Sequence, residues 1–178
     1  MLAAGMGRRV GKPKALLEVE GKKYLDIAIS NCQICDETIV ITNSITEDYC
    51  EKMGYNSIEN LSLDDGMIGS ISVGLHAYPD SNHYLIYPVD FPFVKKETVT
   101  QLIDVLNDND AVNCIKPTFK GRSGHPLVLG SCVTKAIREK SNKPLNELLR
   151  ECESVLLPTE DEGIHININT LDDIKARY

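Results

Sequence analysis

Short apolar runs rich in β-branched residues alternate along this chain with longer segments of helical periodicity. Four of the short runs predict buried strands, at residues 38–42, 83–87, 111–115 and 126–129. Seven segments predict helices, at about residues 23–33, 45–53, 68–77, 95–107, 131–140, 144–151 and 171–177. In the fourth helix Val99, Leu102, Ile103 and Leu106 share one face. The alternation indicates βαβ units and a mainly parallel sheet covered by helices on both sides.

The start of the chain predicts one more strand, of unusual brevity. If Met1–Ala3 is the tail of the first strand, almost nothing precedes it. We expect either that this strand is very short or that the natural chain begins upstream of Met1. In a sheet of this kind ligands bind beyond the carboxyl ends of the strands, so the loops that follow strands are where a site is expected.

Length and composition are those of an ordinary globular protein. The 178 residues are 42% hydrophobic and 25% charged, which predicts one domain over residues 1–178 whose core needs neither disulfides nor a structural metal. The composition excludes collagen, coiled coil and wholesale disorder. No apolar run approaches the roughly 20 residues of a membrane span, and no apolar signal core follows the N-terminus. We therefore expect a cytoplasmic protein without a membrane partner.

Cysteine usage agrees with that compartment, because the six cysteines are too few and too scattered for a disulfide scaffold. We expect mostly reduced thiols. Cys32 and Cys35 form a C-x-x-C pair, which lacks the second pair or the histidines of a structural zinc site. The pair also lies at the end of a predicted helix, whereas the redox motif usually opens one. Incidental thiols are favoured over a thiol-redox protein.

Charge is distributed unevenly along the chain. The net charge of −7 argues against a broad basic surface for nucleic acid. Residues 1–14 nevertheless contain four basic side chains and no acid, so the acidic balance lies in the remainder of the chain. A basic loop on an acidic body indicates local binding of an anion.

Glycines are interleaved with those basic residues, but two common phosphate-binding patterns do not fit. The dinucleotide fingerprint fails because Val10 stands where the third glycine is required. The Walker loop fails because Lys12 is followed by Pro13 and because Met6 occupies the position of the first glycine. What remains is a loop that can bring backbone N–H groups and cations to a phosphate, or a solvated basic turn.

Five motifs in one order span nearly the whole chain and carry a resemblance. The segment Leu-Ala-Ala-Gly-x-Gly-x-Arg-x-Gly-x-Pro-Lys at residues 2–14 resembles the signature loop of the MobA-like NTP transferases. The other motifs are Gly-Met-x-x-Ser-x-x-x-Gly-Leu at 66–75, Asp-x-Pro at 90–92, Gly-His-Pro at 124–126 and Asn-Ile-Asn-Thr at 167–170. The last departs from the family's Asp-Ile-Asp-Thr. The set is most similar to the molybdenum cofactor cytidylyltransferase-like branch.

The resemblance implies a three-layer α/β/α, Rossmann-like fold of nucleotide-diphosphosugar-transferase type with a mostly parallel sheet. It also implies transfer of a nucleoside monophosphate from an NTP to a phosphorylated acceptor, with release of pyrophosphate. Positioning and electrostatics dominate the catalysis of such transfers. The implied catalytic residues are Arg9 and Lys14, which would contact the triphosphate, and Asp90, which would hold Mg²⁺.

The remaining site residues follow from the same resemblance. The residues expected to bind nucleotide are Leu2, Ala3, Ala4, Gly5, Gly7, Lys14, Gly66, Met67 and Ser70. Ser70 would offer its hydroxyl to base or ribose, although residues 66–74 also fit a plain helix start. His125 would lie on the acceptor side or serve a structural role. Asn169 would be a second metal ligand, without the charge of the family's aspartate. An Ala-Ala-Gly loop is associated with cytidylyl transfer, which favours CTP.

Several readings stay open at this point. The favoured acceptor is molybdopterin cofactor, and a sugar phosphate or a phosphorylated alcohol is the alternative. A non-catalytic nucleotide-binding or chaperone-like module belongs to a different class, and Asn169 and the short first strand support it. An enzyme that receives the finished cofactor is a further expected partner.

Overall fold

The computed structural model describes residues 1–7, 11–62, 66–109, 111–139, 143–168 and 173. Its helices are η1 (Lys14–Leu16), α1 (Tyr24–Asn31), α2 (Ser44–Met53), α3 (Gly66–Ala77), α4 (Lys96–Asp108), α5 (Ser131–Arg138), α6 (Leu145–Glu151) and η3 (Glu162–His165). Its strands are β1 (Glu18–Val19), β2 (Lys22–Lys23), β3 (Val40–Thr42), β4 (Ser57–Glu59), β5 (Tyr84–Ile86), β6 (Cys114–Phe119), β7 (Arg122–Ser123), β8 (Leu127–Leu129) and β9 (Val155–Pro158).

The first residues of the chain lie between two parallel strands. Leu2 forms parallel bridges to Ile41 on one side and to Pro88 on the other. Its N–H donates to the Tyr87 carbonyl at 2.9 Å, and its own carbonyl accepts from Val89 at 3.1 Å. On the opposite side Ala3 donates to the Ile41 carbonyl at 2.8 Å. The predicted short first strand is therefore a real, central part of the sheet, and β4 pairs in parallel with β3 beyond it.

The other half of the sheet changes direction at β8, which runs antiparallel to both β5 and β6. The reason is the connection: β6 turns through Lys120 and Gly121, both at positive φ, into its antiparallel partner β7 and then into β8. No crossover helix intervenes, and a parallel pairing needs one. After α5 and α6 the chain returns in parallel beside β6 as β9.

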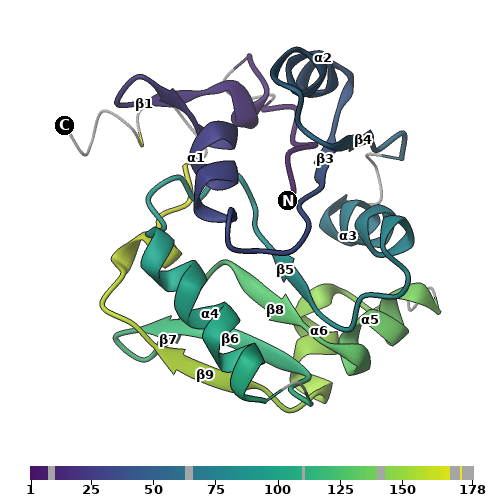
Figure 1. The fold of residues 1–178 in the computed structure, drawn as a ribbon, viewed down its shortest axis with the longest axis vertical. Coiled ribbons are helices and arrows are strands. Elements are labelled where there is room, and N and C mark those ends of the chain that lie inside the picture. Colours follow the sequence, from purple (N-terminus) through teal and green to yellow (C-terminus); the bar gives the residue numbers. More distant parts are fainter. Residues whose placement is uncertain (8–10, 63–65, 110, 140–142, 169–172, 174–178) are drawn as a thin grey trace.

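Helices cover the sheet in two layers (Figure 1). On one side the buried residues of α1, α2 and α4 form a core that includes Leu25, Cys50 and Val99. On the other side α3, α5 and α6 bury Leu75, Ile137 and Leu148 against β5, β6 and β8. The three-layer arrangement matches the prediction. Within the described part of the chain, no helix combines the length and the apolar character needed to cross a membrane.

Helix prediction was accurate and strand prediction was less complete. Six of the seven predicted helices are present as α1 to α6, and the predicted segment 171–177 lies outside the described residues except for Asp173. On α4, Val99 and Leu102 are fully buried, as its periodicity predicted. The four predicted strands correspond to β3, β5, β6 and β8, whereas β1, β2, β4, β7 and β9 were not predicted.

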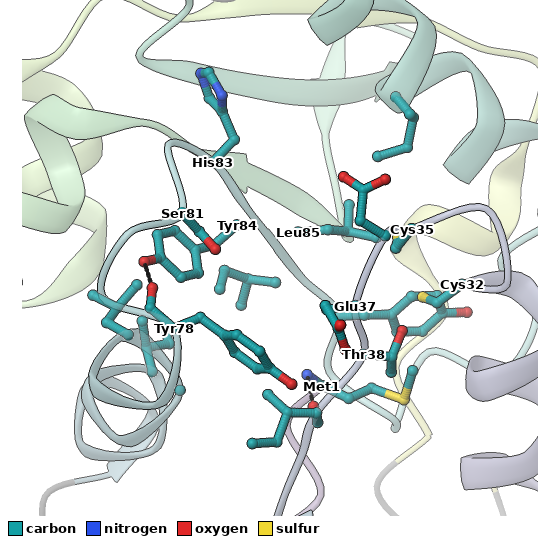
Figure 2. Close-up of a pocket in the computed structure, with 18 of the residues that line it drawn as sticks. Met1, Cys32, Cys35, Glu37, Thr38, Tyr78, Ser81, His83, Tyr84 and Leu85 are labelled. Carbon is teal, nitrogen blue, oxygen red and sulfur yellow. Dashed lines mark hydrogen bonds between the residues drawn. The ribbon is translucent and has the colours of Figure 1, made fainter. Parts of the chain in front are cut away.

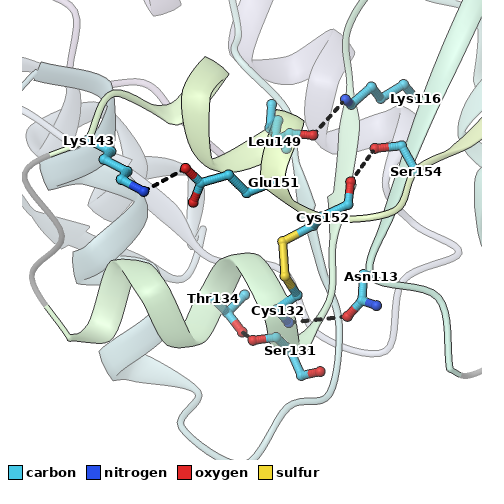
Figure 3. The surroundings of a disulfide bond; sticks show 10 residues. All are labelled: Asn113, Lys116, Ser131, Cys132, Thr134, Lys143, Leu149, Glu151, Cys152 and Ser154. Carbon is cyan, nitrogen blue, oxygen red and sulfur yellow. Dashed lines mark hydrogen bonds and ion pairs between the residues drawn. A yellow bond between two sulfur atoms is a disulfide. The ribbon is translucent and has the colours of Figure 1, made fainter.

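The cysteines are mostly free thiols, as expected, with one exception. Cys132, on α5, and Cys152, after α6, form a disulfide (Figure 3). Cys32, Cys35, Cys50 and Cys114 are free. The disulfide was not predicted, because nothing in the sequence pairs two cysteines that are 20 positions apart.

Replacing two of the glycines by alanine should change the free energy of unfolding in opposite directions. A Cβ at Gly130 would lie 2.3 Å from the Val112 carbonyl oxygen, so Gly130→Ala should lower the free energy of unfolding by about 1–3 kcal/mol. Gly74 is inside α3, and a Cβ there would meet the Ile41 side chain at 3.8 Å. Gly74→Ala should therefore raise the free energy of unfolding by roughly 0.5–1 kcal/mol. Urea denaturation measures the free energy of unfolding of both variants. A change of the same sign and size in the two would contradict the packing described.

Candidate functional site

The basic loop (residues 4–14) follows the central strand directly and folds back on itself. The N–H of Lys14 donates to the Gly5 carbonyl at 3.4 Å, and that of Gly11 donates to the Gly7 carbonyl at 3.0 Å. Gly7 has a φ of +56°, and a Cβ on it would meet the Lys12 carbonyl oxygen at 1.9 Å. Glycine is therefore required at residue 7 by the loop's own backbone. Arg9, predicted to contact the triphosphate, lies outside the described residues, as do Arg8 and Val10.

Lys14 is positioned where the loop ends, and its side chain crosses to a distant acid. Pro13 precedes it in extended conformation, and η1 begins at Lys14 itself. Its Nζ donates to Oδ2 of Asp90 at 2.7 Å, with 21% and 18% of the two side chains exposed. The structure thus brings together two predicted catalytic residues that are 76 positions apart.

Asp90 is presented by a turn at the carboxyl end of β5. Val89 is bonded to the central strand, and the N–H of Phe91 donates to the Pro88 carbonyl at 3.3 Å. The carbonyl of Asp90 accepts from Ile168 at 2.9 Å. Hydrogen bonds therefore fix the backbone on both sides of Asp90. Its carboxylate pairs with Lys14 near the carboxyl ends of the parallel strands.

A magnesium ion fits this carboxylate only in a particular way. Within the described ranges, no group of three or more His, Cys, Asp or Glu side chains is arranged to hold a metal. Mg²⁺ in phosphoryl-transfer sites is commonly held by one or two carboxylates together with substrate phosphates. Asp90 is partly exposed and suits that arrangement. The ammonium group of Lys14, which pairs with Asp90 here, would pair with the phosphates of an anionic substrate instead.

The predicted second metal ligand, Asn169, lies outside the described residues. The residue before it, Ile168, is 1% exposed and contacts Asp90 through the backbone hydrogen bond. The segment that leads into the closing motif therefore reaches the Asp90 turn through Ile168. Asn169 as a ligand stays a prediction.

His125 is partly buried and packs against the turn that carries Asp90. The ring of His125 packs on Phe91 with centroids 4.8 Å apart, and the backbone N–H of His125 donates to the Ile164 carbonyl at 3.0 Å. Nδ1 is buried, and no hydrogen-bond partner for it lies within the described structure. Burial lowers the pKa of His125, while the negative charge of Asp90 acts in the opposite direction. The acceptor-side role of His125 stays a prediction.

The second glycine motif begins α3 as expected, and Ser70 has a definite partner there. Gly66 takes a φ of +62°, and Met67 is 44% exposed. Ser70 is buried, and its hydroxyl oxygen accepts from Nδ2 of Asn60 at 3.0 Å. Ser70 thus links α3 to the residue that follows β4, and its predicted contact with base or ribose stays a prediction.

Asn43 is a residue that the sequence analysis missed. It is 1% exposed, its Oδ1 accepts from Thr46 at the start of α2, and its Nδ2 donates to the Ala4 carbonyl at 3.2 Å. The side chain therefore joins a helix cap to the basic loop. An asparagine between an apolar run and a helical segment is a typical N-cap, and that signal could have identified it.

A cavity of about 660 Å³ lies beside the central strand and contains neither Lys14 nor Asp90 (Figure 2). Leu2 and Ser70 reach it, and Cys32 and Cys35 line its wall. A hydrogen bond from the Cys32 thiol lowers the pKa of Cys35, and the same bond together with burial raises the pKa of Cys32. Both sulfurs are free, and the interpretation as incidental thiols stays a prediction.

Comparisons with known proteins identify a matching family model and similar sequences. The MobA-like NTP transferase domain matches residues 1–155. A molybdenum cofactor cytidylyltransferase from Escherichia coli (strain K12) is 26% identical over 185 residues, which covers 99% of this chain and 94% of that protein. A probable molybdenum cofactor guanylyltransferase from Bacillus cytotoxicus is 29% identical over 160 residues, which covers 88% and 77%.

A solved structure confirms the predicted fold class. Molybdopterin-guanine dinucleotide biosynthesis protein A from Archaeoglobus fulgidus superposes with a TM-score of 0.74 at 20% identity. The match covers 98% of this chain and 93% of that one. At this identity the likeness concerns the fold.

Burial of His125 predicts a pH dependence of stability. Because the folded-state pKa lies below the ordinary 6.5, the unfolded chain takes up a proton first as the pH falls. The free energy of unfolding should therefore decrease between about pH 7.5 and about pH 5.5, and His125→Gln should reduce that decrease. Urea denaturation at the two pH values measures it. A decrease of equal size in both proteins would show that His125 does not carry the effect.

Proposed function

The chain belongs to the MobA-like NTP transferase family, and we propose that it transfers CMP from CTP to the phosphate of molybdopterin cofactor and releases pyrophosphate. The observation that carries this proposal is the Lys14–Asp90 pair, 2.7 Å apart at the carboxyl ends of the central strands. A cation and a carboxylate at one point are what a triphosphate with a bound divalent ion would engage. The relatives named above are cytidylyl- and guanylyltransferases of molybdenum cofactor, which supports the acceptor class.

The Lys14–Asp90 contact suits exchange of partners when a nucleotide binds. In the described structure Lys14 neutralises Asp90. A triphosphate at the basic loop would draw Lys14 toward its oxygens, and the carboxylate would then be available to a cation that accompanies the nucleotide. Mg²⁺, when bound, would supply charge neutralisation of the phosphate oxygens.

The chain's own residues would contribute position and charge. A phosphate oxygen of the acceptor attacks the α-phosphorus of CTP, and the bond from that phosphorus to the bridging oxygen of the β-phosphate breaks. Lys14 and Arg9 would stabilise the negative charge that develops on the triphosphate as pyrophosphate leaves. No protein nucleophile is needed, because the attacking oxygen belongs to the acceptor.

The choice of CTP rests on residues 3–5, which read Ala-Ala-Gly. They lie at the end of the central strand, where Asn43 holds the Ala4 carbonyl. The family resemblance associates this sequence with cytidylyl transfer, and a relative aligned over 99% of the chain is a cytidylyltransferase. GTP is the competing donor, because other relatives are probable guanylyltransferases.

Turnover should depend on Asp90. With CTP, Mg²⁺ and molybdopterin cofactor, the protein should release pyrophosphate, and Asp90→Asn should lower kcat by roughly 10²–10³-fold. Asp104→Asn, which changes an exposed acid on α4, is the matched control and should keep parental turnover. A coupled pyrophosphate assay gives the rates.

The acceptor panel in the same assay separates the competing functions. Turnover with sugar phosphates or phosphorylated alcohols but not with molybdopterin would replace the proposed acceptor. Absence of pyrophosphate with every NTP and every acceptor would favour a non-catalytic nucleotide-binding protein. Full activity of Asp90→Asn would remove the metal assignment.

Donor preference is testable without the acceptor. A ligand that binds the folded state stabilises it by RT ln(1 + [L]/Kd), about 2.7 kcal/mol at a ligand concentration of about 100 Kd. In the presence of Mg²⁺, CTP should raise the Tm more than GTP, ATP or UTP at equal concentration. Lys14→Gln should reduce the shift, whereas Lys96→Gln, which alters an exposed lysine of α4, should not. A larger shift with GTP would change the assigned donor.

A further inference from the structure

A buried carboxylate outside the predicted site links two segments that meet at Asp90. Asp161 is 2% exposed and lies just before η3. Its Oδ2 accepts from the Lys95 N–H at 2.8 Å and from the Thr98 hydroxyl at 2.7 Å. Its Oδ1 accepts from the Gly163 N–H at 2.8 Å. Burying a carboxylate is costly unless its oxygens are bonded, and here three donors satisfy it.

The first link fixes the far end of the turn that carries Asp90. Lys95 is the N-cap residue of α4, and its own side chain makes no capping hydrogen bond. Asp161 caps this helix from another part of the chain, with its negative charge at the positive end of the helix dipole. The hydrogen bond from Lys95 to Asp161 therefore fixes the end of the turn that runs from Asp90 to Lys95.

The second link runs through the segment that Asp161 begins. A Cβ on Gly163 would lie 2.0 Å from the Phe93 carbonyl oxygen, so the two backbones are in direct contact. The Ile164 carbonyl accepts from His125, and the segment ends with the Ile168 N–H donating to the Asp90 carbonyl at 2.9 Å. Residues 90–95 and 161–168 thus form a closed ring, joined at Asp90–Ile168 and at Lys95–Asp161.

We propose that Asp161 is a positioning residue that holds Asp90, and the segment leading to Asn169, in the geometry required for a divalent cation. The inference rests on the proposed metal-dependent reaction. Asp161 acts through the ring and contacts no reacting group. Its carboxylate is needed in particular, because an amide has a single oxygen, and its NH2 group would then face the N–H of either Lys95 or Gly163.

The direct test measures Mn²⁺ binding in the presence of CTP, with the electron paramagnetic resonance signal of the free ion as the readout. Loss of a partner that orients a metal ligand typically weakens binding by roughly 10- to 100-fold. Asp161→Asn should raise the apparent Kd for Mn²⁺ by about that factor. Thr98→Val, which removes one donor and leaves the carboxylate, should have a smaller effect in the same direction and remains informative if Asp161→Asn does not fold.

The matched control is Asp26→Asn. Asp26 accepts hydrogen bonds from the hydroxyls of Tyr49 and Tyr55, at 2.9 and 3.0 Å, neither of which belongs to the ring. This variant should lose stability and keep the parental Kd for Mn²⁺. If Asp26→Asn weakens Mn²⁺ as much as Asp161→Asn does, or if Asp161→Asn binds Mn²⁺ like the parent, the proposal is wrong.

Amide hydrogen exchange provides a readout that needs neither metal nor turnover. Asp161→Asn should accelerate exchange of the Ile168 amide by roughly 10-fold or more relative to the Ile41 amide, because only the former belongs to the ring. Equal acceleration of both amides would indicate general destabilisation and overturn the proposal. If the parent releases no pyrophosphate, the proposed function fails, and this exchange measurement still decides whether Asp161 holds the Asp90 turn.

Discussion

The backbone of residues 1–3 bonds to two strands at once, and the arrangement of the site depends on this double pairing. Leu2 bridges to Ile41 and to Pro88. Because both partners run parallel to it, three chain segments end at the same edge of the sheet. The basic loop leaves from one of them, the Asp90 turn from the second, and Asn43 from the third. Charges of opposite sign meet at this edge because the ladder aligns the three ends.

Around that edge the site is held by backbone contacts more than by side chains. Gly7 lies against Lys12 and Gly163 against Phe93, at distances that exclude any Cβ. Besides the Lys14–Asp90 pair, Asn43 and Asp161 supply long-range side-chain links, one to the loop and one to the turn. The residues proposed to act on phosphate are therefore few, and those that orient them lie behind the site.

Prediction from sequence succeeded where a signal was local. Helical periodicity repeats over many residues, so α4 and its buried face could be predicted, and ordered motifs singled out Lys14 and Asp90, which the fold brings together. The reversal at β8 depends on a short connection through Lys120 and Gly121, which hydrophobicity does not reveal. Strands such as β4 escaped detection because Ile58 is its single apolar residue and is exposed. The link from Asp161 to α4 could not be found either, since Thr98 and Lys95 are 63 and 66 positions away.

The disulfide between Cys132 and Cys152 has a topological consequence. It converts residues 132–152, which include α5 and α6, into a covalent ring attached to β8 and leading into β9. A single cut in the peptide chain between these cysteines would leave both fragments linked, with α5 and α6 still tethered to the sheet. The nicked protein would migrate as one species until reduced. The α5–α6 pair is thus secured by a covalent bond, whereas the sheet edge that carries Lys14 and Asp90 is secured by noncovalent contacts.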